Sequence, residues 1–175
     1  MYGDCINLTF VFLMSFIYAL IEIEIEGKNG WMKGIPTPEI IKLGNKNMTL
    51  YHLYMLALII ITVIFQNMMV FTLYSFLYSA SNVLLVLFLE DILWFIFNPH
   101  FTLDKYTKKD IWWHSEQPWY LGMPLHNYIL TFIIITLSYI TNNVYIFYNL
   151  IFSYFFIGIS IVLAPIYHKF YNYVH

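Results

Sequence analysis

Long apolar runs dominate the chain, and short polar breaks separate them. Runs of roughly 17–25 residues are long enough to cross a bilayer as helices. Five such spans are predicted, over about residues 5–24, 50–70, 72–97, 124–141 and 144–167. The breaks at 66–67 and 142–143 are short and polar, so each predicts a tight turn between antiparallel helices.

The apolar runs do not have the pattern of transmembrane β-strands. Such strands alternate polar and apolar residues over about ten positions, whereas residues 59–65 (IIITVIF) and 132–137 (FIIITL) show no alternation. The predicted fold is therefore an all-α integral membrane protein. A single transmembrane domain is expected over residues 1–175, with a bundle of about five helices.

The segment Ile21–Glu26 does alternate, with three isoleucines and three glutamates. From Ile6 to Ile21 a helix would rise only about 24 Å, short of the ~30 Å hydrocarbon core. The helix is therefore expected to continue into the glutamates, where Glu22 and Glu26 share a face and Glu24 points away. Glu22 is predicted at the inner membrane boundary, and the two later glutamates in progressively wetter surroundings.

Composition agrees with a membrane protein. The 175 residues are 61% hydrophobic and 10% charged, with a mean hydropathy of +0.68, whereas soluble domains carry about 25% charged residues. The prediction is a multi-pass protein of the cell membrane in contact with the lipid bilayer. A net charge of −2 without any arginine argues against a nucleic-acid partner. Cys5 is the single cysteine, which excludes a disulfide framework.

The lysines orient the predicted bundle. Cytoplasmic loops of membrane proteins are enriched in lysine and arginine. With five spans and an outside N-terminus, residues 27–49, residues 98–123 and the C-terminus are all cytoplasmic. These segments hold all eight lysines: Lys28, Lys33, Lys42, Lys46, Lys105, Lys108, Lys109 and Lys169.

Two acidic residues near the inner end of the third span are the candidate catalytic residues. Asp91 follows Glu90, and it would lie about 10 Å inside that end along the helix axis. A carboxylate in a transmembrane segment costs about 2.5–3.5 kcal/mol on insertion scales, and such residues are functional by default. The alternative is a structural hydrogen-bond network that holds helices together.

Imidazoles and a further carboxylate are predicted at the same membrane boundary. Imidazole suits Zn or Fe, so a divalent metal is the candidate cofactor. Its expected ligands are His52, His100, His114, His126 and Glu22. Their spacing matches no established metal motif. The simpler interpretation of His52 and His126 is a half-polar ring at the start of a helix, in the membrane interface.

The segment from Ile111 to Pro124 is rich in tryptophan, which is enriched at membrane interfaces. We expect this loop to lie on or dip into the membrane surface and to shape the opening of the site. The candidate substrate-binding residues are Trp94, Asn98, Trp112 and Trp113.

Three further runs combine charged or polar residues with aromatic ones: IEIEGKNGWMKGIPT (23–37), LEDILWFIFNPH (89–100) and IWWHSEQPWY (111–120). In these runs the chain resembles a group of small polytopic prokaryotic membrane proteins. The resemblance implies that the ED-x2-W-x3-NPH and WWH runs belong to a shared signature, and it brings no activity, substrate or ligand.

Three functions remain open. The first is a membrane metalloprotein or enzyme with a His/carboxylate site at the cytoplasmic boundary, acting on a lipid-like substrate. The second is a non-catalytic subunit that packs against a membrane-protein partner or a second copy of itself. The third is a proton-coupled transporter or channel that uses Glu90 and a polar stripe from Ser75 to Asn82.

Overall fold

Five helices and two small hairpins are formed by the described part of the chain. The computed structural model describes residues 2–31, 36–67 and 72–175. The helices are α1 (Tyr2–Glu26), α2 (Leu50–Asn67), α3 (Leu73–Phe97), α4 (Leu125–Ile140) and α5 (Val144–Val174). The prediction of a mainly helical fold is confirmed. Lys33 and residues 68–70 of the predicted second span lie outside the described residues.

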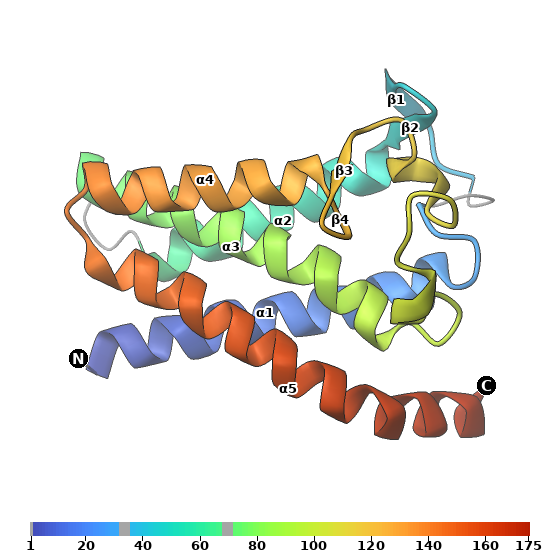
Figure 1. The fold of residues 1–175 in the computed structure, drawn as a ribbon. Coiled ribbons are helices and arrows are strands. Elements are labelled where there is room, and N and C mark those ends of the chain that lie inside the picture. Colours follow the sequence, from blue (N-terminus) through green and yellow to red (C-terminus); the bar gives the residue numbers. More distant parts are fainter. Residues whose placement is uncertain (1, 32–35, 68–71) are drawn as a thin grey trace.

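Successive helices run in opposite directions, so their polar connections gather at one end of the bundle (Figure 1). Helix α3 is central and packs against all four other helices. Its second half is almost entirely buried, with Phe88, Leu93 and Phe95 in the core. The acidic pair Glu90–Asp91 belongs to this buried half, so α3 carries the two carboxyl groups to the end where the connections meet.

Side-chain caps set the limits of α3. Thr72 accepts a hydrogen bond from the Ser75 backbone amide, and the Ser75 hydroxyl accepts one from the Thr72 amide, which forms a capping box. At the other end Asn98 leaves the helical conformation, and Pro99 disfavours its continuation. Helix α5 starts at the cap Asn143 and continues through Pro165 to Val174, beyond the predicted end near residue 167.

Among the described residues, three helices are long and apolar enough to cross a membrane: Leu8–Glu26, Leu73–Phe97 and Val144–Val174. The prediction had five spans. Helices α2 and α4 are apolar but have only 18 and 16 residues. At 1.5 Å per residue, α4 rises about 24 Å against a core of ~30 Å.

Two hairpins occupy the connections at the polar end, and the helical pattern did not predict them. Strands β1 (Glu39–Leu43) and β2 (Lys46–Thr49) pair antiparallel, as do β3 (Trp119–Tyr120) and β4 (Met123–Pro124). Gly44 turns the first hairpin with φ +61°, a conformation that favours glycine. Asn45 at its tip donates a backbone hydrogen bond to Glu116 Oε2 at 3.1 Å, which docks the hairpin on the Trp-rich loop.

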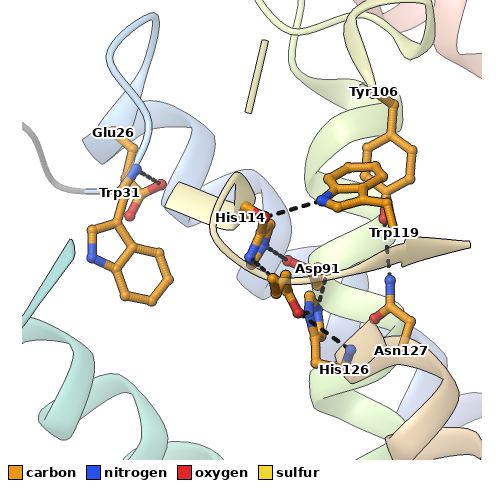
Figure 2. A network of polar contacts seen from close by, with 9 residues as sticks. Glu26, Trp31, Asp91, Tyr106, His114, Trp119, His126 and Asn127 are labelled. Carbon is orange, nitrogen blue, oxygen red and sulfur yellow. Dashed lines mark hydrogen bonds and ion pairs between the residues drawn. The ribbon is translucent and has the colours of Figure 1, made fainter. Parts of the chain in front are cut away.

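The expectation that Glu26 is the wettest of the three glutamates is wrong, and Trp113 of the Trp-rich loop is buried beside it at the same end of the bundle. Trp113 lies in the core at 5% exposure, between Phe95 and Phe101. Glu26 is also buried at 9% exposure, and its Oε2 accepts the Trp31 backbone amide at 3.0 Å (Figure 2). In both cases the connections fold back over the helix ends, and this tertiary packing excludes water from positions that the local pattern left exposed.

Candidate metal centre

Asp91, His114 and His126 converge from three separate parts of the chain. Asp91 comes from α3, His114 from the short 3₁₀ turn Trp112–His114, and His126 from the start of α4. Their side chains point toward one another (Figure 2). His126 Nε2 lies 3.2 Å from Asp91 Oδ2, and His114 Nε2 lies 3.6 Å from Asp91 Oδ1. One ligand atom from each residue lies within 4.8 Å of the others, which is the spacing of a metal-ligand set.

Gln117 contacts the Nδ1 atom of both imidazoles. Its amide Nε2 lies 2.7 Å from His114 Nδ1, and its Oε1 lies 3.1 Å from His126 Nδ1. Both Nε2 atoms therefore face Asp91. Metal-binding histidines are held in this way by a partner on the second ring nitrogen, which sets the ring orientation and the tautomer.

The contacts of Gln117 imply that a positive charge is needed between His126 and Asp91. The amide oxygen of Gln117 is an acceptor, so it requires a proton on His126 Nδ1. The amide nitrogen is a donor, so it requires a lone pair on His114 Nδ1. A neutral His126 then has a lone pair on Nε2, directed at the carboxylate of Asp91. Because two acceptors do not attract, that contact needs a cation between them or a second proton on the ring.

Burial lowers the pKa of the His114 imidazole, and the neighbouring Asp91 opposes this shift. His114 is only 6% exposed, and this burial favours the neutral form of its ring. Neutral imidazole is the form that binds metals. The missing positive charge therefore falls to His126 as an imidazolium or to a bound cation.

Aromatic residues of the connection fix this loop in place. Trp119 Nε1 donates to the His114 carbonyl at 3.0 Å, and Asn127 Nδ2 donates to the Tyr106 hydroxyl at 3.1 Å (Figure 2). Burial raises the pKa of Tyr106 above its usual range, so its hydroxyl stays protonated. These contacts join the loop to α4 and keep His114 within reach of α3.

Glu90 faces a second acidic group on the other side of α3. Its carboxyl group lies near that of Glu22 of α1. Like charges this close disfavour ionisation of both groups. An inner cavity of about 290 Å³ and an outer cavity of about 590 Å³ are both lined by Glu90 and Asp91. The two predicted catalytic residues therefore stand where the cavities meet.

His52 and His100 lie outside the Asp91 group. His52 Nδ1 is 2.9 Å from Thr49 Oγ1, and the ring packs on Trp31 and lines the inner cavity. His100 is exposed and faces Tyr171 near the end of α5. The turn at Pro99 directs His100 away from α4, so the structure does not bring it to the other predicted ligands.

The predicted substrate-binding residues divide between two roles. Trp94 and Trp113 line the inner cavity. Asn98 is fully buried, donates to the Gly27 carbonyl at 3.2 Å, and accepts the His100 amide at 2.9 Å. Trp112 offers its carbonyl to Asn45 of the hairpin. Asn98 and Trp112 therefore position loops and do not line either cavity.

The polar stripe on α3 is largely satisfied within the helix. Ser79 donates to the Ser75 carbonyl at 2.8 Å, and Ser81 donates to the Tyr78 carbonyl at 2.7 Å. Asn82 is fully buried, and neither of its amide atoms has a hydrogen-bond partner among the described residues. These contacts give the serines a structural use that does not require a path for protons.

Two residues of the site were not singled out by sequence reasoning. Gln117 lies three positions after His114, a spacing that joins both side chains across a short turn. Lys46 Nζ rests 3.7 Å over the Trp31 ring and lines the outer cavity. Burial lowers its pKa to about 8. The local sequence signals neither role, because both depend on packing between distant segments.

Comparison of the chain with protein-family models, with curated proteins and with solved structures gave no match.

Proposed function

We propose that the protein is a multi-pass membrane metalloprotein that binds one divalent metal ion through Asp91, His114 and His126. The observation that carries the proposal is the convergence of three ligand atoms within 4.8 Å, with both imidazoles held by Gln117. Two imidazoles and one carboxylate form a ligand set that binds Zn or Fe and leaves open positions for water or substrate.

The two nitrogen ligands fit a metal after one adjustment. A metal on both Nε2 atoms leaves both Nδ1 atoms protonated, so Gln117 would turn its oxygen to accept from both rings. A carbonyl oxygen has two lone pairs and is able to do this. The metal also supplies the positive charge that the Asp91–His126 contact requires.

The apolar helices support placement in a membrane. Three of them have the length and composition of membrane spans. Large side chains of α5 remain exposed, including Phe155 at 62%, Val162 at 75% and Ile166 at 67%, and a bilayer would cover them. We propose that α2 and α4 also cross, since a short helix is accommodated by local thinning of the bilayer.

The five-span arrangement puts the N-terminus outside and the metal centre at the cytoplasmic boundary. It follows from the positive-inside rule, because the connections at the polar end and the end of α5 carry the described lysines. A substrate at this depth would be lipid-like or amphipathic.

An enzymatic role follows from the neighbours of the metal. A bound divalent ion polarises a substrate oxygen or lowers the pKa of a bound water. Glu90 lies near Glu22, lines both cavities together with Asp91, and is suited to general acid–base chemistry. The protein would thus combine a Lewis acid and a proton carrier at one cavity junction.

The test is elemental analysis of protein purified in detergent without chelators. We expect about one Zn, Fe or Mn per chain, retained in His100→Ala and lost in His114→Ala/His126→Ala. His100 is the matched control because it is a histidine outside the group. Wild-type protein that stays metal-free after loading with each ion, or a double variant that keeps its metal, contradicts the proposal.

A proton-transfer role without metal is the second candidate. It is favoured by the glutamine contacts, which one extra proton on His126 would also satisfy. Proteoliposome proton flux that is lost in Glu90→Gln, together with absence of metal, would support this function instead.

A further inference from the structure

The outer cavity contains a lysine as well as the three proposed metal ligands. It measures about 590 Å³ and lies between residues 43–46 of the first hairpin, the Trp-rich loop, α3 and α4. Asp91, His114 and His126 all line it. Among the described lysines, Lys46 alone lines this cavity, and it does not line the inner one. A volume of this size is typical of small-molecule sites, which span roughly 300–1,000 Å³.

The ammonium group of Lys46 is partly buried and lacks an ion pair. Its Nζ lies 3.7 Å over the Trp31 ring, which covers one side of the group. No carboxylate of the described residues lies within 4.0 Å of Nζ, and Asp91 and Glu26 attract its charge from farther away. An ammonium group has three N–H donors. Lys46 therefore keeps donors that a ligand in the cavity is able to use.

A metal ion at the proposed centre would change the charge around Lys46. A divalent ion bound to Asp91 engages the carboxylate that now attracts the lysine. The metal and the ammonium group would then be two positive groups on the wall of one cavity. Charges of the same sign repel strongly where water is partly excluded. An anion that contacts both groups removes this repulsion.

The other two carboxyl groups of the outer cavity are placed away from this pair of positive groups. Glu116 is turned to the hairpin, where its Oε2 accepts the Asn45 amide at 3.1 Å. Glu90 also lines the inner cavity. Neither forms an ion pair with Lys46 in the described part of the chain. We therefore expect an anion to bind between Lys46 and the metal.

Apolar side chains extend the outer cavity along the helices. Leu87 lies four residues before Asp91 on α3, and Leu130 lies four residues after His126 on α4. Residues four apart share a helix face, so each leucine lies about 6 Å further from the polar end than the nearby ligand. Both leucines are partly exposed. The cavity thus joins the charged groups to an apolar wall formed by α3 and α4.

We propose that the outer cavity binds an amphiphile whose head is a small oxyanion, a phosphate or a carboxylate. One oxygen of the head would occupy an open position on the metal, and a second would accept a hydrogen bond from Lys46 Nζ. The alkyl chain would pass over Leu87 and Leu130. This inference rests on the proposed metal centre and names the class of its substrate.

The test is protection of Lys46 from acetylation, followed by mass spectrometry on full-length zinc-loaded protein in a maltoside detergent at pH 7. The probes are decyl phosphate, decanoate, decanol and inorganic phosphate. We expect both amphiphilic oxyanions to protect Lys46 at concentrations at least about tenfold lower than decanol, because only they offer a charged acceptor to the ammonium group. Lys42 is the control, since it is exposed on the same hairpin and should not be protected.

Two outcomes of this experiment overturn the proposal. The first is protection of Lys46 by decanol at the same concentration as by both oxyanions, which would mean that the head is not recognised by its charge. The second is equal protection by inorganic phosphate and decyl phosphate, which would assign the cavity to a free anion and remove the alkyl chain from the site.

Variants separate this inference from the proposed function. Lys46→Met should weaken decyl phosphate, measured by calorimetry, at least about tenfold and keep its zinc, whereas Lys42→Met should match wild type in both. Unchanged affinity in zinc-loaded Lys46→Met overturns this inference alone. Wild-type protein that takes up no zinc contradicts the proposed function, and the Lys46→Met comparison then still decides whether the cavity binds an oxyanion. If Lys46→Met does not fold, the acetylation experiment on wild-type protein decides.

Discussion

Asp91 Oδ2 lies 3.2 Å from Nε2 of His126, a residue 35 positions further along the chain. Gln117 contacts Nδ1 of the same ring at 3.1 Å and Nδ1 of His114 at 2.7 Å. One amide thus controls which imidazole nitrogen is protonated on both histidines. The chemistry of the centre therefore depends on a residue that is not itself a ligand.

Gln117 provides the first prediction. Gln117→Ala should weaken zinc binding about 10–100-fold, the usual cost of losing the partner of a metal-bound histidine. Gln117→Glu should bind zinc at least as tightly as wild type, because a carboxylate accepts from both Nδ1 protons. Zinc titration against a competing chelator measures both. Gln66→Ala, at the exposed end of α2, is the control. Equal affinity in Gln117→Ala and wild type would remove this residue from the metal centre.

Gly30 provides a prediction about stability. Gly27 and Gly30 both have positive φ, +53° and +58°, so alanine at either costs about 1 kcal/mol of backbone strain. A Cβ on Gly30 would also lie 2.5 Å from the Trp113 ring, whereas on Gly27 the nearest atom is 3.9 Å away. Gly30→Ala should therefore lower the free energy of unfolding by a further ~1–3 kcal/mol. Reversible unfolding in mixed detergent compares the two, and equal losses would contradict the close packing.

Lys46 provides a prediction about pH. Its pKa is lowered to about 8 from 10.5 because burial disfavours the charged amine. At pH 8 about half of this side chain is unprotonated, against roughly 0.3% at the ordinary value. Acetylation of Lys46, followed by mass spectrometry across pH 6–11, should show a midpoint near 8 in folded protein and a higher midpoint after denaturation. Identical midpoints in the two states would be inconsistent with a buried amine on Trp31.

The same shift predicts how stability depends on pH. The unfolded chain binds the Lys46 proton more tightly than the folded protein does. The penalty for burying the charge is therefore fully present below pH 8 and disappears as pH rises toward 10.5. Lys46→Met should remove this part of the pH dependence, measured as the difference in unfolding free energy between pH 7 and pH 10. If Lys46→Met shows the same change in unfolding free energy between pH 7 and pH 10 as wild type, this prediction is wrong.

The five-span topology is tested by cysteine labelling in a Cys5→Ser background. Val144→Cys lies at the start of α5 and Lys108→Cys in the polar connection before α4. With five spans and an outside N-terminus, a membrane-impermeant maleimide labels position 144 in intact cells and position 108 only after permeabilisation. Labelling of both positions in intact cells would mean that α4 does not cross.

The sequence by itself determined the helices and the side of the bundle on which chemistry gathers. Apolar runs, polar breaks and the caps Thr72 and Asn143 mark helix limits through local interactions. Because successive helices reverse direction, the carboxylates at the end of α3 and the histidine at the start of α4 had to meet at one end. Asp91, His114 and His126 were all among the residues predicted on that basis.

Only the tertiary structure decided which of those residues make contact. His114, His126 and His100 lie in similar polar surroundings in the sequence, but the turn at Pro99 sends His100 toward α5, while Gln117 holds the other two together. The hairpin at Gly44 and the burial of Glu26 and Trp113 depend on connections folding back over the helix ends. Helix periodicity carries no information about such connections, since their positions are set by packing between segments far apart in the chain.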